Sequence, residues 1–568
     1  MTEGLGASGA ELVTDTLIQL GCKHVFNITG LGMHSLVTSF YRRRHELGYI
    51  SDVNETNLAL MAQGYTRQTR KPAFCFTYQA SGTALAMMAM TTAWADHAPL
   101  VIVSTGSART VSGREPYAGL PRSAIEMGAQ YTKWSYEVTT PSRIPEALAR
   151  AYAIAAQPPM GPVHLVIPCD LYDEIVPDAP PRADFARTDF YTEDCADAAG
   201  LDRVAGMLVE ARRPVLIGGS EIGQLGAVEE FIALAEALGA PVLLEDAPSY
   251  LAFPTSHAQY VGGVRSNAAL LAEADTILTI GAEYSEIGDR GEKPPFPSSV
   301  ALASLTVGGL DTTRQLWPDV ALHGHPKPTL ARLAGLVRDA DISASTRDSG
   351  LALCADLRAA RRQKIAAIGG LDRGGSPVPP SQLIDEVRKF CGQDWILLQG
   401  GSTAGFQFDS IFELDDPDIF HGLSGKASAQ GWAGPVSTGI QLAAPQGRVL
   451  ALLGDGNLMF SATCLWAAAK NRLPMIFVVI NNGGWASIPS FMTVYSDFSA
   501  SEAASGAVSD EMGWTFGEAP IDYVGLARGL GLQAARAATA EELGEALRHA
   551  GAGREPWLIE VPTAFEGF

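Results

Sequence analysis

Residues 449–457 read VLALLGDGN, and this stretch decides the expected fold. Its apolar half has the composition of a buried strand, and Gly-Asp-Gly forms a turn at the strand's end. A second apolar run, MIFVVI at 475–480, ends in Asn-Asn-Gly-Gly at 481–484. A helix-like stretch, 461–470, lies between the two runs. Together the three segments predict a parallel β-α-β unit.

Parallel strands point the same way, so the carboxyl ends of both predicted strands open on one crevice. We therefore expect Asp455 and Asn482 to meet there, beside exposed carbonyls of the two loops. A carboxylate, an amide oxygen and a backbone oxygen form a hard-oxygen set suited to a Mg²⁺ ion that also carries phosphate oxygens. Gly, Asp and Asn are also ordinary turn residues. Two plain turns are therefore the alternative, which the order and spacing of both halves disfavour.

The composition describes a large soluble protein. Its 568 residues exceed what one core supports and predict about three domains. Hydrophobic residues make up 47% and charged residues 18%, as in ordinary globular chains. A formal net charge of −21 argues against nucleic acid or an anionic membrane as a partner. The seven Cys include no C-x-x-C pair, and no apolar signal region is present, so we expect a cytoplasmic protein with reduced thiols.

Strand-like and helix-like segments alternate along the whole chain, which predicts an α/β fold with doubly wound parallel sheets. Segments rich in Pro, Gly or Asp at 174–200 and 369–380 are the expected linkers, and the apolar pattern already fades at 339–350. The three expected domains cover 1–180, 195–345 and 365–568. Strands expected in the first two are 24–27, 73–77, 100–104, 163–167, 214–217, 241–244 and 276–280.

The spacing of the split motif makes the chain recognisable. A Gly-Asp-Gly, 24 intervening residues (457–480) and an Asn-Asn together resemble the diphosphate-Mg²⁺ motif of thiamine-diphosphate (ThDP) enzymes. The resemblance implies a pyrimidine-binding, a middle Rossmann-like and a diphosphate-binding domain, in that order. It also implies that Asp455, Asn482 and the carbonyl of Gly484 hold Mg²⁺. Further cofactor contacts implied in this way are Gly30, Glu55, Ser402, Thr403, Ser428, Gln430, Gly454, Gly456, Asn457 and Trp485.

Glu55 is the second feature of weight. Asn54 can cap a helix expected over 56–67, which places Glu55 in the first turn. A carboxylate there is stabilised by the helix dipole, and that is one interpretation. The ThDP family offers another, because its catalytic glutamate heads a helix that ends in a phrase like Gly-Tyr-Thr-Arg, here 64–67. On that resemblance Glu55 hydrogen-bonds N1′ of the aminopyrimidine and promotes the imino tautomer that deprotonates the thiazolium.

Several phrases resemble one subgroup of the family, the benzoylformate decarboxylases, over most of the chain. They identify fold and subgroup and carry no chemistry. The phrases are Lys-Pro-Ala-Phe at 71–74, Ser-Gly-Thr-Ala at 81–84, Ala-Trp-Ala-Asp-His-Ala-Pro-Leu at 93–100, Lys-Trp-Ser-Tyr-Glu at 133–137, Gly-Pro-Val at 161–163, Trp-Ala-Ala-Ala at 466–469 and Leu-Ile-Glu-Val at 558–561.

The positions that define the subgroup's activity differ. Leu31 stands where the resemblance expects a serine, Tyr78 where it expects a first histidine, and 283–291 contains no histidine for the second. A Leu and a Tyr cannot supply the proton relay of two imidazoles near neutral pH. His34 is a candidate substitute acid or, equally, a packed histidine. Gln430 replaces the apolar residue that wedges the cofactor into its V shape. The candidate catalytic residues are therefore Glu55, His34, Tyr78 and Gln430.

Two further segments carry an open choice. Gly-Gly-Ser-Glu-Ile-Gly at 218–223 follows the strand 214–217 and fits a Rossmann-like middle domain, but we identify no acidic residue at the matching strand end. We therefore expect no FAD or other nucleotide there. The segment 485–514 is rich in aromatic, Ser and Gly residues. It is expected to reach over the pocket or to be a plain surface loop.

The resemblance implies attack of the cofactor's C2 carbanion on the carbonyl of a 2-oxo acid. Loss of CO₂ leaves an enamine, which is protonated to an aldehyde or captured by an acceptor carbonyl to form an acyloin. The family places the site between the first domain of one subunit and the third of another, so a homodimer is the minimum and a homotetramer is expected. An acetolactate-type acyl-transferring synthase, a non-decarboxylating C–C lyase and a non-catalytic ThDP-binding homologue are the alternatives.

Overall fold

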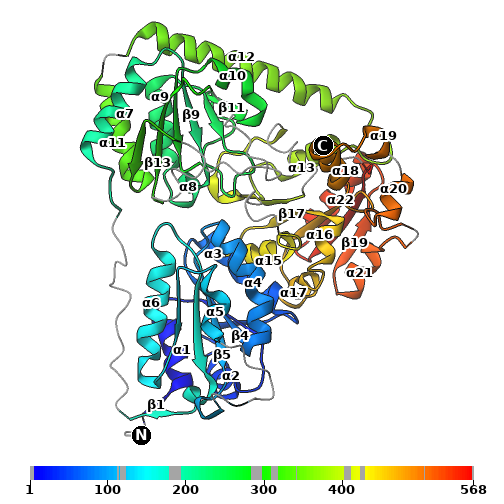
Figure 1. Cartoon of the computed structure of the whole chain (residues 1–568). Helices are drawn as coiled ribbons and strands as arrows, with labels where there is room; N and C mark the ends of the chain where they lie inside the picture. Colours follow the sequence, from blue (N-terminus) through cyan, green and yellow to red (C-terminus); the bar gives the residue numbers. More distant parts are fainter. Residues whose placement is uncertain are drawn as a thin grey trace. The chain divides into compact units, whose positions relative to one another are not determined.

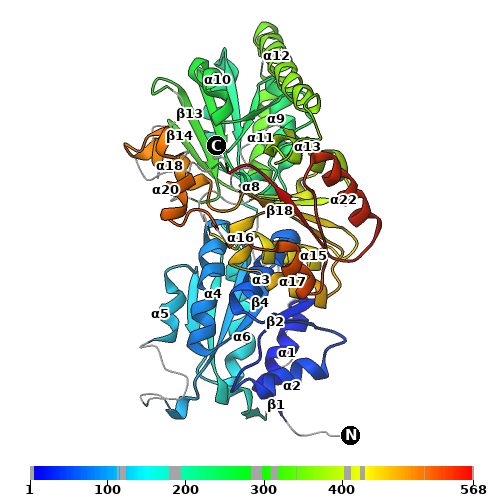
Figure 2. The same cartoon turned by 90° about the vertical axis from the view of Figure 1, so that its right-hand side faces the viewer.

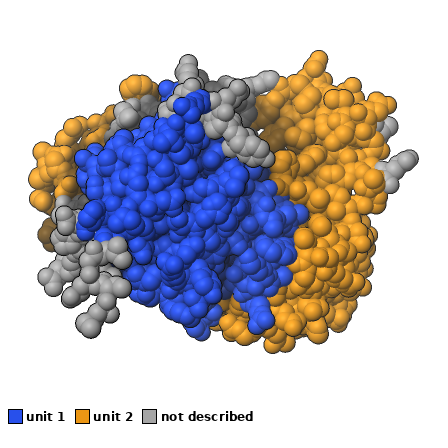
Figure 3. Space-filling view, turned by 90° about the horizontal axis from the view of Figure 1, so that it is seen from below, with its two compact units in different colours: residues 1–192, 429–446, 461–473 blue, residues 193–428, 447–460, 474–568 orange. Residues whose placement is uncertain are grey.

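The computed structural model describes residues 6–111, 114, 123–177, 193–282, 297–308, 317–340, 342–401, 411–422, 429–503, 506–517 and 519–565. The chain folds into two compact units, which Figure 3 shows in different colours. Unit 1 comprises 1–192, 429–446 and 461–473, and unit 2 comprises 193–428, 447–460 and 474–568. In the described residues, three six-stranded parallel sheets form the framework of these units.

The first sheet, drawn in blue and cyan in Figure 1, lies in unit 1 and has the strand order β3-β2-β4-β5-β7-β6. Its core also takes the apolar faces of α1, α2 and α6. The strands are β2 (His24–Asn27), β3 (Gly48–Ile50), β4 (Ala73–Tyr78), β5 (Leu100–Gly106), β6 (Trp134–Glu137) and β7 (Val163–Pro168), with an antiparallel pair β1 (Ala7–Ser8) and β8 (Ile175–Val176) beside them. The helices are α1 (Gly9–Gln19), α2 (His34–Arg42), α3 (Glu55–Thr69), α4 (Gln79–Ala95), α5 (Ala124–Ala129) and α6 (Ile144–Ala156).

Two helices from the last third of the chain belong to unit 1, α15 (Ala433–Ala443) and α17 (Cys464–Lys470). Helix α15 lies beside α3 (Figure 2). Glycines permit this close approach: a Cβ on Gly64 would lie 2.0 Å from the carbonyl oxygen of Val436, and one on Gly439 would lie 1.9 Å from that of Met61. Any larger residue at either glycine would push the two helices apart. The helix that begins at Glu55 is therefore packed closely against α15.

The second sheet, in unit 2, has the order β11-β10-β9-β12-β13-β14, so the winding direction reverses between β9 and β12. Alternate residues of β9 face different helical layers, because Leu216 shares a core with α7, α9 and α11 whereas Val215 and Ile217 pack with α10 and α12. The strands are β9 (Pro214–Gly218), β10 (Val242–Leu244), β11 (Tyr260–Gly263), β12 (Thr276–Ile280), β13 (Ala301–Thr306) and β14 (Val320–His323). The helices are α7 (Ala198–Glu210), α8 (Ser220–Gln224), α9 (Val228–Leu238), α10 (Ala268–Glu273), α11 (Pro326–Asp339) and α12 (Ala344–Gly369).

The third sheet, also in unit 2, has the order β16-β15-β17-β18-β20-β19. Counted along the chain, its strands follow the same 2-1-3-4-6-5 order as those of the first sheet. The strands are β15 (Ile396–Gly400), β16 (Phe420–Gly422), β17 (Val449–Gly454), β18 (Ile476–Asn481), β19 (Gln533–Arg536) and β20 (Trp557–Pro562). The helices are α13 (Pro380–Cys391), α16 (Asp455–Met459), α18 (Ser487–Tyr495), α19 (Ala500–Ala503), α20 (Gly506–Glu511), α21 (Tyr523–Gly529) and α22 (Ala540–Ala552).

The predicted α/β class is confirmed, and each of the seven predicted strands begins and ends within two residues of its expected position. The helix expected at 461–470 begins only at Cys464, so that expectation is wrong for its first three residues. Asp455 starts the short helix α16, so the alternative of a plain turn at this position is wrong. The polar stretch at 339–350 leads into the 26-residue helix α12, because its many Ala, Arg and Leu residues outweigh the scattered Ser and Gly. No helix in the described part of the chain combines the length and hydropathy of a membrane span.

Candidate active site

The structure brings the two halves of the split motif together at adjacent strands of unit 2. Strand β17 pairs with β18, and Asp455 follows the first as Asn482 follows the second. The carboxylate of Asp455 accepts N–H groups from both sides: Oδ1 from Gly456 at 2.7 Å, and Oδ2 from Gly483 at 2.7 Å and Gly484 at 3.1 Å. The side-chain oxygen of Asn482 accepts the N–H of Gly484 at 3.2 Å. One carboxylate therefore ties the two turns into a single structure.

The charge of Asp455 has no cationic partner in the described residues. Its side chain is only 3% exposed, and burial raises its pKa to about 6 against the opposing effect of four backbone N–H groups. Buried charges in proteins are paired or coordinate metals. Among the described residues the buried hydroxyl of Tyr523 also has no hydrogen-bond partner, and burial, Asp455 and Glu560 raise its pKa. An all-oxygen set with an unpaired buried carboxylate fits Mg²⁺.

Trp485 connects the two turns from the side. Its ring lies so close to Gly456 that a Cβ there would be 2.6 Å from Cη2 of the indole. The same ring makes edge-on contacts with Phe460 and Phe516, at centroid distances of 5.9 and 6.3 Å. Glycine at 456 is thus required by the indole as well as by any diphosphate that approaches the backbone. The backbone around Gly456 leaves room for an anionic group such as a phosphate.

Glu55 begins helix α3 in unit 1, as its neighbour's cap predicts. The side-chain oxygen of Asn54 accepts the N–H of Thr56 at 2.7 Å, and Glu55 is half-buried. Its carboxylate packs against the first turn of α4, since a Cβ on Gly82 would lie 2.9 Å from Oε1 of Glu55. Burial and the charge of Glu55 raise the pKa of the Cys75 thiol on β4. Glu55 therefore lies at the carboxyl edge of the first sheet, with its carboxylate in contact with α4.

The loop that carries Glu55 is fastened to residues near α17, a feature that sequence reasoning missed. Asp52 is buried, and its Oδ1 accepts the N–H of Val53 at 2.5 Å and the hydroxyl of Thr463 at 3.4 Å. The amide of Asn57 donates to the same hydroxyl at 2.6 Å and to the carbonyl of Ser461 at 3.2 Å. No local pattern indicates these bonds, because more than 400 residues separate the partners.

Asp52→Asn is expected to stabilise the protein at neutral pH. Burial raises the pKa of Asp52 to about 6, so ionisation costs folding free energy. The cost is absent below about pH 3, where the carboxyl is protonated in both states, and grows to about 3 kcal/mol above pH 6. Asparagine keeps the accepting Oδ1 without the charge. The Tm difference from wild type should be positive at pH 8 and close to zero at pH 3. The exposed control Asp202→Asn should show no Tm difference from wild type at either pH. Equal Tm differences of Asp52→Asn at both pH values would contradict the prediction.

The structure brings together only some of the other predicted site residues of unit 1. Tyr78 ends β4 and covers Gly30, because a Cβ on Gly30 would lie 2.2 Å from the tyrosine ring. His34 is the exposed first residue of α2, and the structure records no hydrogen bond or ion pair of His34 with a described residue. Leu31 and Gln430 are exposed. Ser402, Thr403, Ser428 and the stretch 283–291 lie outside the described residues.

The expectation that no acidic residue follows the second strand of the middle sheet is wrong. Glu245 directly follows β10, and its carboxylate accepts the backbone N–H of Ser220 at 2.6 Å and also bonds the Ser220 hydroxyl. Gly219 packs against the next strand's end, where a Cβ would lie 2.1 Å from the carbonyl oxygen of Gly281. In the sequence, the acidic residue directly after Leu244, at the end of the expected strand, was the signal that could have identified Glu245. Because the chain's own carboxylate occupies the start of α8, a nucleotide phosphate would meet negative charge there.

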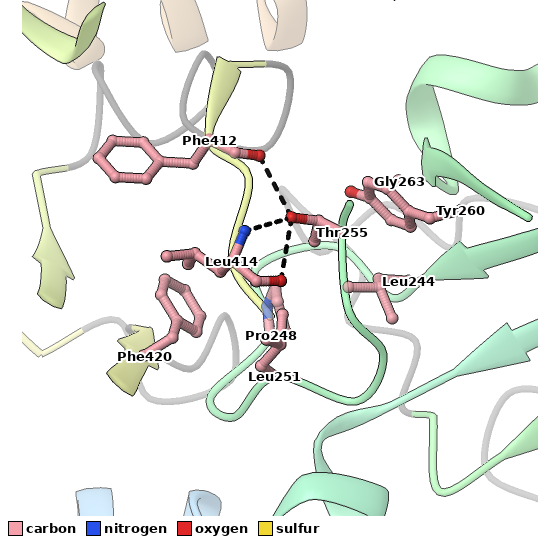
Figure 4. A pocket seen from close by; sticks show the side chains of 9 residues that line it. All are labelled: Leu244, Pro248, Leu251, Thr255, Tyr260, Gly263, Phe412, Leu414 and Phe420. Carbon is pink, nitrogen blue, oxygen red and sulfur yellow. Dashed lines mark hydrogen bonds between the residues drawn. The ribbon is translucent and has the colours of Figure 1, made fainter. Parts of the chain in front are cut away.

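A cavity in unit 2 is unrelated to these residues. It lies between the segment after β10 and residues 411–420, and its lining is largely apolar (Figure 4). The hydroxyl of Thr255 accepts the N–H of Leu414 at 2.7 Å and lies 3.3 Å from the carbonyl oxygens of Phe412 and Leu414. None of the predicted site residues lines this cavity. It is a packing void between a strand edge and a loop.

Comparison with known proteins supplies the family. Models of the thiamine pyrophosphate enzymes match residues 7–127 (N-terminal TPP binding domain), 201–333 (central domain) and 401–561 (C-terminal TPP binding domain). Benzoylformate decarboxylase of Pseudomonas aeruginosa is 30% identical over 520 residues, which cover 91% of this chain and 92% of the relative. A probable acetolactate synthase large subunit of Methanocaldococcus jannaschii is 23% identical over 573 residues, 97% and 91% of the two chains. The solved ThDP-dependent 4-hydroxybenzoylformate decarboxylase of Rhodococcus jostii RHA1 matches with a TM-score of 0.82 and 26% identity, covering 99% and 100% of the two chains.

Proposed function

Because the chain belongs to the family of thiamine-diphosphate-dependent enzymes, we propose that it is a ThDP- and Mg²⁺-dependent lyase and carboligase acting on a 2-oxo acid. The observation that carries this proposal is the buried carboxylate of Asp455, which joins the two strand-end turns and has no cationic partner among the residues that the structure describes. A protein that had lost the cofactor would gain stability by discarding such a charge. Relationship to both decarboxylases and acetolactate synthases supports the reaction class.

Each residue of the proposed site has a role. Asp455, Asn482 and the carbonyl of Gly484 would hold Mg²⁺, and the glycines at 454 and 456 would admit the diphosphate. When bound, ThDP would supply a nucleophilic carbon that adds to a carbonyl and, beside it, a positively charged ring that takes up the electron pair of the cleaved C–C bond. Glu55 would hold and return a proton at its carboxylate, for which its half-buried position at the head of α3 suits it.

For the second half of the reaction, we favour transfer to an acceptor carbonyl over simple protonation. Tyr78 stands at the strand end where the subgroup uses a histidine, and Leu31 is apolar. A phenol can donate a hydrogen bond, but it does not exchange protons readily near neutral pH as an imidazole does. We therefore favour an acceptor carbonyl as the group that completes turnover. A synthase of the acetolactate type is the second candidate.

The proposed assembly is a homodimer at least, and a homotetramer is the expected form. In unit 1, Val53 and Leu85 flank Glu55 and are 62% and 46% exposed. In unit 2, Phe460 contacts Trp485 and is 61% exposed. Apolar side chains exposed around functional residues are typical of surfaces that another chain covers. A second copy that buries them would place the half-sites of two subunits face to face.

A panel of 2-oxo acids tests the function. Purified protein with ThDP and Mg²⁺ is incubated with aliphatic and aromatic 2-oxo acids, each with and without an acceptor aldehyde, and the products are analysed by mass spectrometry. The expected result is CO₂ release that rises when the aldehyde is present, together with a coupled hydroxyketone. Cofactor binding without CO₂ loss or coupled product from any member would overturn the proposal.

A further inference from the structure

The chain leaves the turn formed by residues 483–485 at Trp485, passes through α18, α19 and α20, and returns to the same turn. The returning residues Trp514–Phe516 are called the strap here. The backbone N–H of Trp485 donates to the carbonyl of Trp514 at 2.6 Å, and the N–H of Phe516 donates to the carbonyl of Gly483 at 2.8 Å. The strap therefore runs antiparallel to residues 483–485 as a short two-stranded ribbon.

This ribbon decides which way the groups of Gly484 point. Gly484 lies opposite Thr515, and the two bonds are made by the residues that flank this pair. In such an antiparallel pair the central residue's own N–H and C=O face away from the partner strand. The N–H of Gly484 accordingly reaches Asp455 at 3.1 Å. Its carbonyl is thereby kept out of the ribbon and available to a cation.

The strap is itself secured on both sides. A Cβ on Gly484 would lie 2.1 Å from the carbonyl oxygen of Trp514, so there is no room for a side chain between the turn and the strap. The hydroxyl of Thr515 bonds the carboxylate of Asp510, and the N–H of Trp514 donates to the carbonyl of the buried Ser509 at 2.8 Å. The ring centroids of Phe516 and Trp485 are 6.3 Å apart. Trp514 is the last residue of the segment 485–514, which the sequence left open between a cover and a plain loop, and Thr515 and Phe516 follow it directly.

We propose that the strap holds the 483–485 turn in its metal-binding shape before the cofactor arrives, and that the backbone N–H of Phe516 and the hydroxyl of Thr515 position the Gly484 carbonyl. An unsupported glycine pair would have to be ordered on binding, and that ordering reduces affinity. The strap removes this cost in advance. The consequence for the metal rests on the proposed function, whereas the ordering of the turn can be measured in the protein alone.

Two matched pairs of variants test the proposal. Phe516→Pro removes the N–H that donates to Gly483, and Phe516→Leu keeps both that N–H and an apolar side chain. Thr515→Val removes the hydroxyl that bonds Asp510. Thr493→Val makes the same change on α18, where the hydroxyl donates to the carbonyl of Ser490 at 2.8 Å outside the strap.

The first readout is hydrogen exchange of the Trp485 amide in the full chain without ThDP or Mg²⁺. Wild type should show protection, Phe516→Pro should lose about tenfold and Thr515→Val about threefold, while both controls stay within about twofold. The second readout is the apparent Kd for Mg²⁺ with ThDP present, which should rise by similar factors with kcat unchanged at saturating metal.

Three results would overturn the proposal: an unprotected Trp485 amide in wild type, equal effects of Phe516→Pro and Phe516→Leu, or wild-type metal affinity in both strap variants. If Phe516→Pro fails to fold, equal behaviour of Thr515→Val and Thr493→Val would overturn it. The exchange measurement uses no substrate, so failure of the proposed reaction would leave this test intact.

Discussion

Glu55→Gln is expected to lower kcat by about 10² to 10⁴-fold while ThDP binding changes by less than about threefold. Glutamine keeps the size of the side chain and its contact with Gly82 but cannot take up or return a proton. The cap by Asn54 and the fold of α3 do not depend on the charge. Loss of turnover with retained binding would therefore identify the carboxylate as the acid–base group. Steady-state kinetics and calorimetric titration with ThDP measure the two effects.

Glu541→Gln is the matched control, because Glu541 also lies in the first turn of a helix but is exposed, on α22. It reports the loss of a favourable helix-dipole interaction, which is worth less than about 1 kcal/mol at an exposed site. Activity of the control should equal that of wild type. Full activity in Glu55→Gln would reduce Glu55 to a dipole-stabilising residue and would contradict the proposed function.

Asp455→Asn is expected to weaken Mg²⁺-dependent ThDP binding by at least about 100-fold. One oxygen of Asp455 accepts Gly456 and the other accepts Gly483 and Gly484, so both sides of the carboxylate need acceptors. An amide would turn its NH₂ group toward at least one of these N–H groups. The loss of a charged ligand and of one such bond costs about 3 kcal/mol. Fluorescence titration with ThDP at fixed Mg²⁺, and with Mg²⁺ at fixed ThDP, measures the effect.

Asp522→Asn controls for the substitution itself. Asp522 caps α21 by accepting the N–H of Gly525 at 2.8 Å, a function that asparagine also performs. Its cofactor affinity should match wild type. Undiminished affinity in Asp455→Asn would show that the buried carboxylate only holds the two turns together, and the metal assignment would fail.

Much of the candidate site follows from short-range patterns. Strand composition and a turn at each strand end predict that Asp455 and Asn482 lie at neighbouring strands, and the pairing of β17 with β18 bears this out. The cap by Asn54 predicts the start of α3, since the acceptor and the capped N–H are two residues apart. Topology rules need only the order of elements, so they apply before any side chain is placed.

The features that sequence reasoning missed depend on contacts between distant residues. The sequence shows that Glu245 follows an expected strand, but only the fold shows that its carboxylate accepts a hydrogen bond from Ser220. The bonds of Asp52 and Asn57 with Thr463 join segments about 400 residues apart. The helix expected at 461–470 begins late, because residues 461–463 form a turn before it.

By itself the sequence determined the α/β class, the alternation of strands and helices, and the identity of the groups that meet at the strand ends. Those outcomes follow from backbone geometry and from side-chain periods of two or three to four residues, which are local properties. Only the tertiary structure decided that Asp455 is buried with no cationic partner in the described part of the chain, that Gly484 is paired opposite Thr515, and that α3 is packed against α15. Burial, charge isolation and close helix approach depend on which distant segments share a surface, and no local pattern encodes that choice.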